Sequence, residues 1–257
     1  MASAPEALPL FYKELVPLSS QQHGDWKGRA GENLAILRGI HAVPLTSDEL
    51  VSAGRCYPVV FTQGDDPVPL GLFGLNEGVN VFLNEDDMLA PDTYLPAYVR
   101  RYPWMLVPLR PDTQEMTLCC DPASGLIGPE VDGTPLFVDG EASADTKGML
   151  QFCEDFQLAA QRTSAFVAEL KSYDLLIDAE ISIDQPGEAQ PFLYRGFQMV
   201  SEEKLKALRG DQLRKMMQSG MLALIHAHLF SLQLMPVIFD RQYRSGRVPQ
   251  SEGLAQS

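Results

Sequence analysis

The sequence predicts an α+β fold in which a largely antiparallel sheet, built in the N-terminal half, packs against helices from the C-terminal half. Over residues 33–138, short apolar runs alternate with turns rich in Gly, Pro and Asp, which is typical of antiparallel strands. From residue 145 onwards, apolar residues recur at spacings of three, four and seven, which is typical of helices with one buried face.

The first half should contain a meander of strands. Apolar and β-branched residues predict these strands over residues 33–45, 57–62, 68–75 and 79–83. Between the first two, Thr46 should cap a short helix, because its hydroxyl can accept from the backbone and two acids follow in the first turn. We expect that helix to stop near Gly54.

A second short helix is expected between Pro96 and Pro103, because proline suits the first turn of a helix and ends one elsewhere. Two further strands, over residues 104–109 and 116–120, should pair across a turn at residues 111–112. The segment after them, up to Val138, is expected to be loop-like.

The second half should be mainly helical. We expect a long helix over residues 145–173, and then a hairpin of strands 177–183 and 192–200 around a turn at residues 186–187. Ser201 should cap the next helix, which two glycines, Gly210 and Gly220, interrupt.

No Pro- or Gly-rich linker separates two composition regimes, so one α+β domain is expected over residues 21–245. Residues 1–20 should form an extended N-terminal segment. Residues 246–257 should form a polar, disordered tail.

The charge of the chain excludes a class of partners. The formal net charge is −14 and the isoelectric point is near 4.6. A nucleic-acid-binding protein needs a basic face to displace counterions from phosphates, and this chain has none of useful length. We therefore expect no nucleic-acid partner.

The expected compartment is the cytoplasm. The first residues lack the basic and apolar regions of a secretory signal. The four cysteines, two of them adjacent at Cys119 and Cys120, form no CxxC pair and are expected to be reduced thiols.

One stretch, residues 221–239, is long and apolar enough to be mistaken for a membrane span. It contains two histidines, a glutamine and a proline, which a bilayer would penalise without partners. We therefore expect a buried core helix and no membrane span.

The histidines provide no convincing metal site. His23 and Asp25 have the His-x-Asp spacing of a facial triad, which then needs a distant second histidine. His226 and His228 are two apart, so on a helix they point about 200° from each other and cannot bind one ion. We predict no metal site and no cofactor.

No nucleophile or phosphate loop stands out either. The sequence has no GxSxG motif, and Cys153 lies in an apolar helical stripe where a thiol behaves as a small hydrophobe. The three glycines of residues 71–78 match neither of the common phosphate-binding loops. We therefore name no catalytic residue.

The most distinctive segment is a concentration of tyrosine, tryptophan and arginine, the residue types that dominate interface hot spots. Its members are Tyr94, Tyr98, Arg100, Arg101, Tyr102 and Trp104. The tyrosines recur every four residues, so they would share one helix face. That face is either a binding surface or a helix packed on the sheet with both arginines paired to acids.

The chain resembles the SapC family of bacterial proteins. The motifs that carry the resemblance are LFYKELVPLS at 10–19, YPVVFT at 57–62, PLGLFGL at 69–75, YLPAYVRRYPW at 94–104, FVDGE at 137–141, LYRGFQMVSEEKLKAL at 193–208 and SGMLALIHAHLFSLQ at 219–233. The peptide-transporter permease that shares the short name is a different protein, since it would need several long apolar spans.

The resemblance implies an association with a bacterial surface layer and implies no catalytic residues. We therefore expect a non-enzymatic accessory protein that binds a protein or peptide partner through the aromatic and arginine residues. The alternative is an uncatalogued enzyme, metal-dependent through His23 and Asp25, or the partner of an enzyme that modifies peptides or amino acids. Surface association would require export without a cleaved signal.

Overall fold

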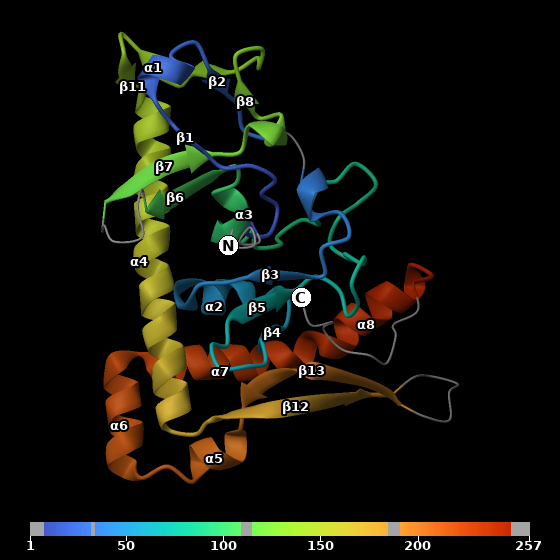
Figure 1. Cartoon of the computed structure of the whole chain (residues 1–257). Coiled ribbons are helices and arrows are strands. Elements are labelled where there is room, and N and C mark those ends of the chain that lie inside the picture. Colours follow the sequence, from blue (N-terminus) through green and yellow to red (C-terminus); the bar gives the residue numbers. More distant parts are fainter. Residues whose placement is uncertain (1–7, 32–33, 109–114, 185–190, 248–257) are drawn as a thin grey trace, which may run out of the picture. The chain divides into compact units, whose positions relative to one another are not determined.

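The computed structural model describes residues 8–31, 34–108, 115–184 and 191–247 (Figure 1). It confirms the α+β class, with antiparallel sheets from the N-terminal half and helices toward the C-terminus. The expected turns at residues 111–112 and 186–187 and most of the expected tail lie outside the described residues.

The chain forms two compact units, and each contains pieces from both halves of the sequence. The first unit comprises the described parts of Met1–Glu32 and Val99–Leu158, and the second those of Asn33–Tyr98 and Ala159–Ser257. A single domain over residues 21–245 stays a prediction. The longest helix, α4 (Ala144–Ser172), contributes residues to both units, and its bounds agree with the helix predicted over residues 145–173.

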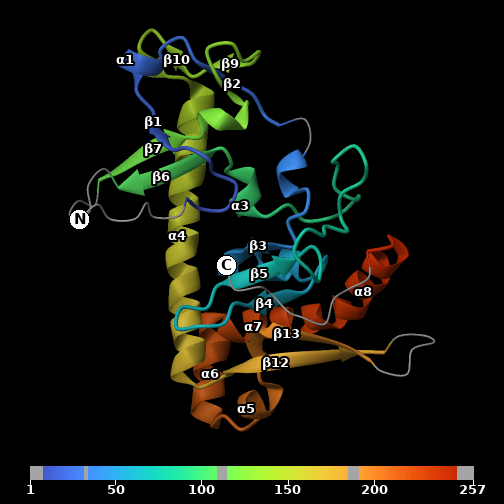
Figure 2. The same ribbon diagram turned by 45° about the vertical axis from the view of Figure 1, so that its right-hand side comes forward.

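The first unit contains three small antiparallel sheets (Figure 2). Their strand orders are β1–β7–β6, β8–β2–β9 and β10–β11. The bounds are β1 (Val16–Pro17), β2 (Lys27–Gly28), β6 (Trp104–Pro108), β7 (Met116–Cys120), β8 (Ile127–Gly128), β9 (Thr134–Pro135), β10 (Phe137–Val138) and β11 (Glu141–Ala142). The short helices of this part are α1 (Ser20–His23) and the 3-10 turn η3 (Pro122–Ser124), while α3 (Ala97–Arg100) begins in the second unit.

The predicted strands 104–109 and 116–120 are confirmed as β6 and β7, which pair from Trp104 opposite Cys120 to Pro108 opposite Met116. The core behind them is apolar and includes two thiols. It consists of Trp104, Leu106, Leu118, Cys120, Ile127, Leu136 and Cys153.

The second unit is built on a five-stranded antiparallel sheet of order β12–β13–β4–β5–β3. The strands are β3 (Ala42–Pro44), β4 (Val59–Phe61), β5 (Pro69–Leu72), β12 (Leu176–Ile183) and β13 (Phe192–Val200). The predicted hairpin of the second half is confirmed, and it extends the sheet begun by the strands of the first half.

Helices surround this sheet. They are η1 (Ala35–Leu37), η2 (Ser47–Glu49), α2 (Leu50–Ala53), α5 (Glu202–Lys206), α6 (Gly210–Ser219), α7 (Met221–Ser231), η4 (Leu232–Leu234) and α8 (Met235–Arg244). Both predicted caps are confirmed: the Thr46 hydroxyl and the Glu49 side chain form a capping box, and the Ser201 hydroxyl accepts from the backbone N–H of Lys204.

The prediction of a strand over residues 79–83 is wrong, because hydrogen bonds of an asparagine side chain take the place of strand pairing there. Asn80 is buried, its amide donates to the Leu37 carbonyl (3.0 Å), and its Oδ1 accepts from the Phe82 N–H (2.8 Å). Leu83 forms only an isolated bridge with Leu89.

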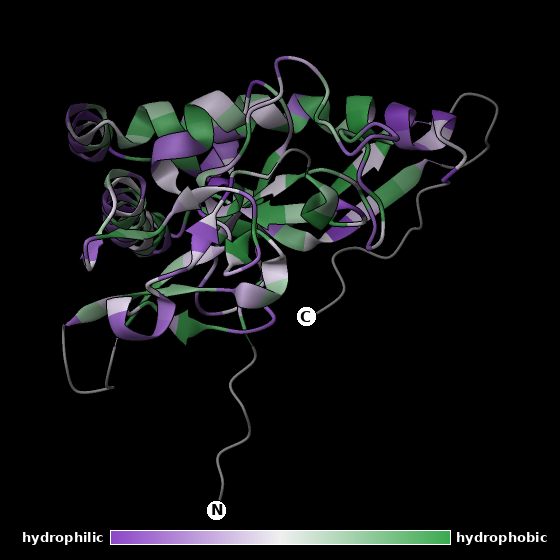
Figure 3. Cartoon of the chain, turned by 90° about the horizontal axis from the view of Figure 1, so that it is seen from above, coloured by the Kyte–Doolittle hydropathy of each residue, from purple (hydrophilic) through white to green (hydrophobic). Residues whose placement is uncertain are grey.

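The apolar stretch expected as one core helix is α7, η4 and α8, and only one of its faces is buried. Pro236, which lacks an N–H, lies in the first turn of α8, and a 3-10 turn precedes it. His228, Ser231 and Gln242 have no exposed surface, whereas Phe230 is 65% exposed. In Figure 3 these helices are mostly green, the colour of apolar residues, and turn purple toward the polar end of α8.

Candidate functional site

The six residues predicted as a binding site do not form one helical face. Helix α3 covers only Ala97–Arg100, so Tyr94 and Tyr102 lie outside it and the expected stripe of three tyrosines is wrong. Tyr94 and Tyr98 belong to the second unit, whereas Arg100, Arg101, Tyr102 and Trp104 belong to the first.

The two tyrosines of the second unit differ in burial, since Tyr94 is half-buried and Tyr98 is buried. The Tyr94 hydroxyl donates to Glu49 Oε1 (3.1 Å), which also accepts from the Ala97 N–H (2.6 Å). Tyr98 is 7% exposed. A partner would therefore meet little of the Tyr98 side chain, while the Tyr94 hydroxyl is already engaged by Glu49.

The other four predicted residues lie together in the first unit, at one end of the sheet β1–β7–β6. Trp104 begins β6 and is buried, and so is Arg101. The Arg101 guanidinium lies 4.2 Å from the centroid of the Phe156 ring, a stacking arrangement that suits its planar, weakly hydrated cation. Arg100 is exposed, and its guanidinium lies 5.2 Å from the centroid of the Phe152 ring.

The N-terminal segment completes this group. The rings of Phe11 and Tyr12 meet the Tyr102 ring edge to face, with centroids 6.0 and 5.2 Å apart. The Tyr12 hydroxyl donates to the Trp104 carbonyl at 2.6 Å, and the Tyr12 ring lies 5.9 Å from the Arg101 guanidinium.

We call this group the aromatic–arginine cluster. It consists of Phe11, Tyr12, Arg100, Arg101, Tyr102, Trp104, Phe152 and Phe156. Its buried members are Tyr12, Arg101 and Trp104, and its exposed or half-buried members are Phe11, Arg100, Tyr102, Phe152 and Phe156. Figure 2 shows the elements that carry it: the blue trace before β1, the end of α3, the start of β6, and α4.

A fully buried carboxylate lies beside the cluster. Asp121 directly follows β7, and its two oxygens accept from the backbone N–H of Lys13 (2.8 Å) and of Ala123 (2.9 Å). Burial, and next the nearby Asp121 carboxylate with its hydrogen bond, raise the pKa of Tyr102 to about 12, so this phenol keeps its proton at neutral pH.

Sequence reasoning missed Phe11, Tyr12 and Asp121. The sequence predicts only an extended N-terminal segment, and no local pattern connects Tyr12 with Trp104, 92 residues later. Asp121 follows a strand like many turn acids, and nothing in its neighbours indicates complete burial.

The cluster is suited to recognition and carries no group poised for covalent chemistry. Burial raises the pKa of the nearby thiols, to about 12 for Cys120 and to about 11 for Cys153, which keeps them in the unreactive protonated form. Aromatic faces, guanidinium groups and half-buried rings instead provide contact area of the kind that protein interfaces use.

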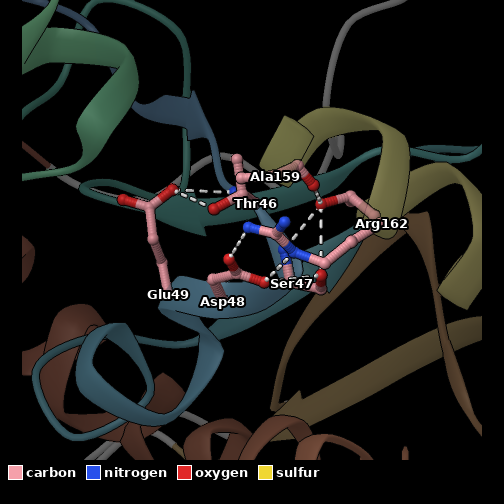
Figure 4. Close-up of polar contacts among 7 residues, drawn as sticks. Thr46, Ser47, Asp48, Glu49, Ala159 and Arg162 are labelled. Atoms are coloured by element: carbon pink, nitrogen blue, oxygen red, sulfur yellow. Dashed lines mark hydrogen bonds and ion pairs between the residues drawn. The ribbon is translucent and has the colours of Figure 1, made fainter. Parts of the chain in front are cut away.

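A second polar group, around residues 46–49, is fully engaged in holding the second unit together (Figure 4). Glu49 Oε2 accepts from the N–H and the hydroxyl of Thr46, both at 2.8 Å, and Asp48 forms an ion pair with Arg162 on α4. The Ser47 N–H donates to the Thr163 hydroxyl (2.7 Å). These bonds attach the turn to α4, so we assign it a structural role.

Three of the four histidines are also engaged structurally. His23 is buried, its Nδ1 accepts from the Ser19 N–H (3.1 Å), and its ring packs on Trp26 at a centroid distance of 4.3 Å. That arrangement turns one ring nitrogen of the candidate His-x-Asp pair toward its own helix. Across residues 8–31, 34–108, 115–184 and 191–247, no three His, Cys, Asp or Glu side chains are arranged to hold a metal ion.

His228, on α7, bridges two strands of the second unit. Its Nε2 accepts from the Val200 N–H (3.1 Å), so its Nδ1 carries the proton that bonds the Val59 carbonyl (2.9 Å). Burial lowers the pKa of His228 to about 4, and the imidazole is therefore neutral. His226 is half-buried and bonds the Leu222 carbonyl of its own helix (2.8 Å).

By length and composition alone, Met221–Arg244 would be long and apolar enough to cross a membrane, with a mean hydropathy of 1.7 in its most apolar window. A helix that packs in a protein core passes the same test. The hydrogen bonds of His228 to the sheet backbone show how this stretch packs in the second unit.

Comparison with curated proteins and with solved structures gives no match. The family model SapC matches residues 18–237, which is most of the chain. The matched region includes six of the eight cluster residues, all between 100 and 156, while Phe11 and Tyr12 precede it. The motif at residues 10–19, which contributed to the resemblance, lies almost wholly before the matched region. The chain therefore belongs to the SapC family.

Proposed function

We propose that this SapC-family chain is a non-enzymatic accessory protein that binds a protein or peptide partner through the exposed members of the aromatic–arginine cluster. The observation that carries the proposal is the division within the cluster. Tyr12, Arg101 and Trp104 are buried and fix the geometry, while Arg100 and Tyr102 remain accessible.

This division is the arrangement expected of a contact surface. Rings held by packing lose little conformational freedom when a partner binds, so more of the contact energy contributes to affinity. An exposed arginine over an aromatic ring offers a cation and a flat apolar face in one place. The net charge of −14 favours a partner, or a partner segment, without a strong acidic excess.

The test is a crosslinking pull-down from cells that express tagged wild type, Arg100→Ala or Tyr102→Ala. We expect one or more partners to be recovered with wild type and lost with both variants. Tyr98→Ala is unsuitable, because Tyr98 is buried in the second unit and its loss would change packing.

The matched control is Arg195→Ala, which removes an exposed arginine from β13, where it pairs with Glu180. Partners recovered equally with wild type, Arg100→Ala and Tyr102→Ala, all three being folded by circular dichroism, would contradict the proposal. Loss of partners with Arg195→Ala as well would show that the effect is not specific to the cluster.

The cytoplasmic location and the surface-layer association are alternatives that cell fractionation separates. The proposal places the protein in the cytoplasm, a compartment that suits its four free cysteines. Recovery of the tagged chain in the surface-layer fraction, with a cytoplasmic marker absent from it, would favour the surface-layer role instead.

A further inference from the structure

The N-terminal segment of residues 9–18, here called the strap, lies on the first unit as a bound peptide would. Val16 and Pro17 pair antiparallel with Cys120 and Cys119 of β7, and the Leu18 N–H donates to the Leu118 carbonyl (2.8 Å). Adding an extended segment to a sheet edge is a common mode of peptide recognition, in which backbone bonds give affinity and side-chain pockets give specificity.

Tyr12 is the side-chain anchor of the strap. It is 6% exposed, its hydroxyl bonds the Trp104 carbonyl, and its ring contacts Arg101 and Tyr102. One residue later, the Lys13 backbone N–H is held by the buried Asp121 carboxylate. The groups that receive the strap are thus a carbonyl, a carboxylate, a guanidinium and an aromatic ring, all supplied by residues 101–121.

The strap is held in a conformation that its own sequence disfavours. The Tyr12 N–H closes a turn onto the Pro9 carbonyl (3.0 Å), and Phe11 within that turn has φ of 81°. Positive φ is unfavourable for a bulky L residue and is usually left to glycine. Contacts with the receiving groups must offset this strain, and such strained segments are frequent at clamps and switches.

The outward side chains of the strap contribute little to holding it. Leu10 is 38% exposed, and Lys13 and Glu14 are exposed as well. The attachment depends on Tyr12, on the side chains of Phe11 and Leu18, and on the backbone bonds. An extended peptide with the same residues in the same places could make the same contacts.

We infer that residues 9–18 are an intramolecular ligand, and that the site beneath them takes an extended peptide in which an aromatic residue and a tyrosine precede an apolar strand-forming stretch. The inference rests on the proposed function, because it names the partner class for the buried half of the same cluster. The strap then acts as a competitor in cis, and a partner gains access in proportion to the fraction of molecules whose strap is detached.

The experiment uses the full-length chain and a fluorescein-labelled peptide of the strap sequence, PLFYKELVPL, with fluorescence anisotropy as the readout. In wild type the strap occupies the site, so the peptide should bind weakly. Tyr12→Ala removes the anchor of the strap and leaves the receiving groups intact. We expect this variant to bind the peptide roughly 10- to 100-fold more tightly than wild type, because the apparent affinity rises with the fraction of molecules whose strap is detached.

Two variants show whether the peptide uses the same site. Adding Asp121→Asn to Tyr12→Ala replaces one acceptor oxygen by a donor, so the gain in affinity should be lost. Lys13→Ala is the matched control in the strap, because only the Lys13 backbone N–H is used, and it should bind the peptide as weakly as wild type. A labelled peptide with alanine in place of its tyrosine should not bind Tyr12→Ala.

Equal affinity of wild type and folded Tyr12→Ala would overturn the inference, and so would binding that survives Asp121→Asn or the loss of the tyrosine from the peptide. If Tyr12→Ala does not fold, Tyr12→Phe removes only the bond to Trp104 and must still raise the affinity. The result of the pull-down with Arg100→Ala does not depend on any of these outcomes, so either proposal can be contradicted without the other.

Discussion

His228 makes the stability of the second unit sensitive to pH. Its imidazole has no exposed surface, and both ring nitrogens bond the backbone of neighbouring strands, which requires the neutral form. In the unfolded chain the same group titrates near 6.5, whereas in the folded chain burial lowers its pKa to about 4. The unfolded state therefore binds a proton first as the pH falls.

The magnitude follows from this difference in pKa. The stability is fully present above pH 6.5 and is lost as the pH falls toward 4, where the folded state also becomes protonated. The gap between the two pKa values corresponds to on the order of 3 kcal/mol in total. Between pH 7 and pH 5 the loss due to this one group should be about 2 kcal/mol.

Urea unfolding at pH 7 and pH 5, followed by circular dichroism, measures this loss. Helicity is the appropriate probe, because both tryptophans, Trp26 and Trp104, lie in the first unit and their fluorescence reports on that unit. The comparison is between wild type and His228→Gln, whose amide does not titrate. Each protein is compared with itself at the two pH values, so a lower starting stability of the variant does not matter.

We expect the free energy of unfolding of wild type to fall by about 2 kcal/mol more than that of His228→Gln over this interval. His226→Gln is the control, since it removes a half-buried imidazole from the same helix and leaves His228 in place. If wild type and His228→Gln lose the same free energy between pH 7 and pH 5, the assignment of a neutral, strand-bridging His228 is refuted.

Three further predictions concern packing in the second unit, with Gly148 of the first unit as a comparison, and urea midpoints measure all of them. Among the described residues, the buried Tyr194 hydroxyl has no hydrogen-bond partner, so Tyr194→Phe should raise the stability by about 1 kcal/mol, and a loss of that size would contradict this. A Cβ at Gly71 would lie 2.5 Å from a ring carbon of the buried Tyr57, so Gly71→Ala should lower the free energy of unfolding by about 1 to 3 kcal/mol. At Gly148, within α4, an added Cβ would meet no atom within 4 Å, so Gly148→Ala should raise the free energy of unfolding by about 0.5 to 1 kcal/mol. Glu49→Gln puts an amide where the two carboxylate oxygens accept from Thr46, Tyr94 and Ala97, and should cost on the order of 2 kcal/mol, with unchanged stability as the contrary result.

Elements whose stabilising partners are close in sequence were predictable. Helix α4 follows from its apolar spacing, and α5 from the serine cap with two following acids. The hairpin of β12 and β13 follows from two alternating runs around a turn. In each case the residues that fix the element lie within it or next to it.

Errors arose where a distant partner decided the local structure. Residues 79–83 have the composition of a strand, but the hydrogen bond from the Asn80 side chain to the Leu37 carbonyl holds them in an irregular conformation. The tyrosine stripe failed because α3 has four residues, too few for side chains at a spacing of four to share a face. The candidate site was predicted in part: the composition of residues 100–104 indicated it, while Tyr12 and Asp121 join it through long-range contacts that no local pattern encodes.

The choice between a packed and a binding segment, open from the sequence, has a physical answer that differs from residue to residue. One segment can both pack in the core and bind a partner if different side chains take the two roles. In the first unit, Arg101 and Trp104 are buried and contact Phe156 and Tyr12, while Arg100 and Tyr102 keep accessible surface. The strap contributes the ring of Tyr12 over Arg101 and the Lys13 N–H on Asp121, so whatever displaces the strap removes one contact from each. A partner that binds the outer residues and one that replaces the strap would therefore be coupled, because each alters the rings that hold Tyr102 in place.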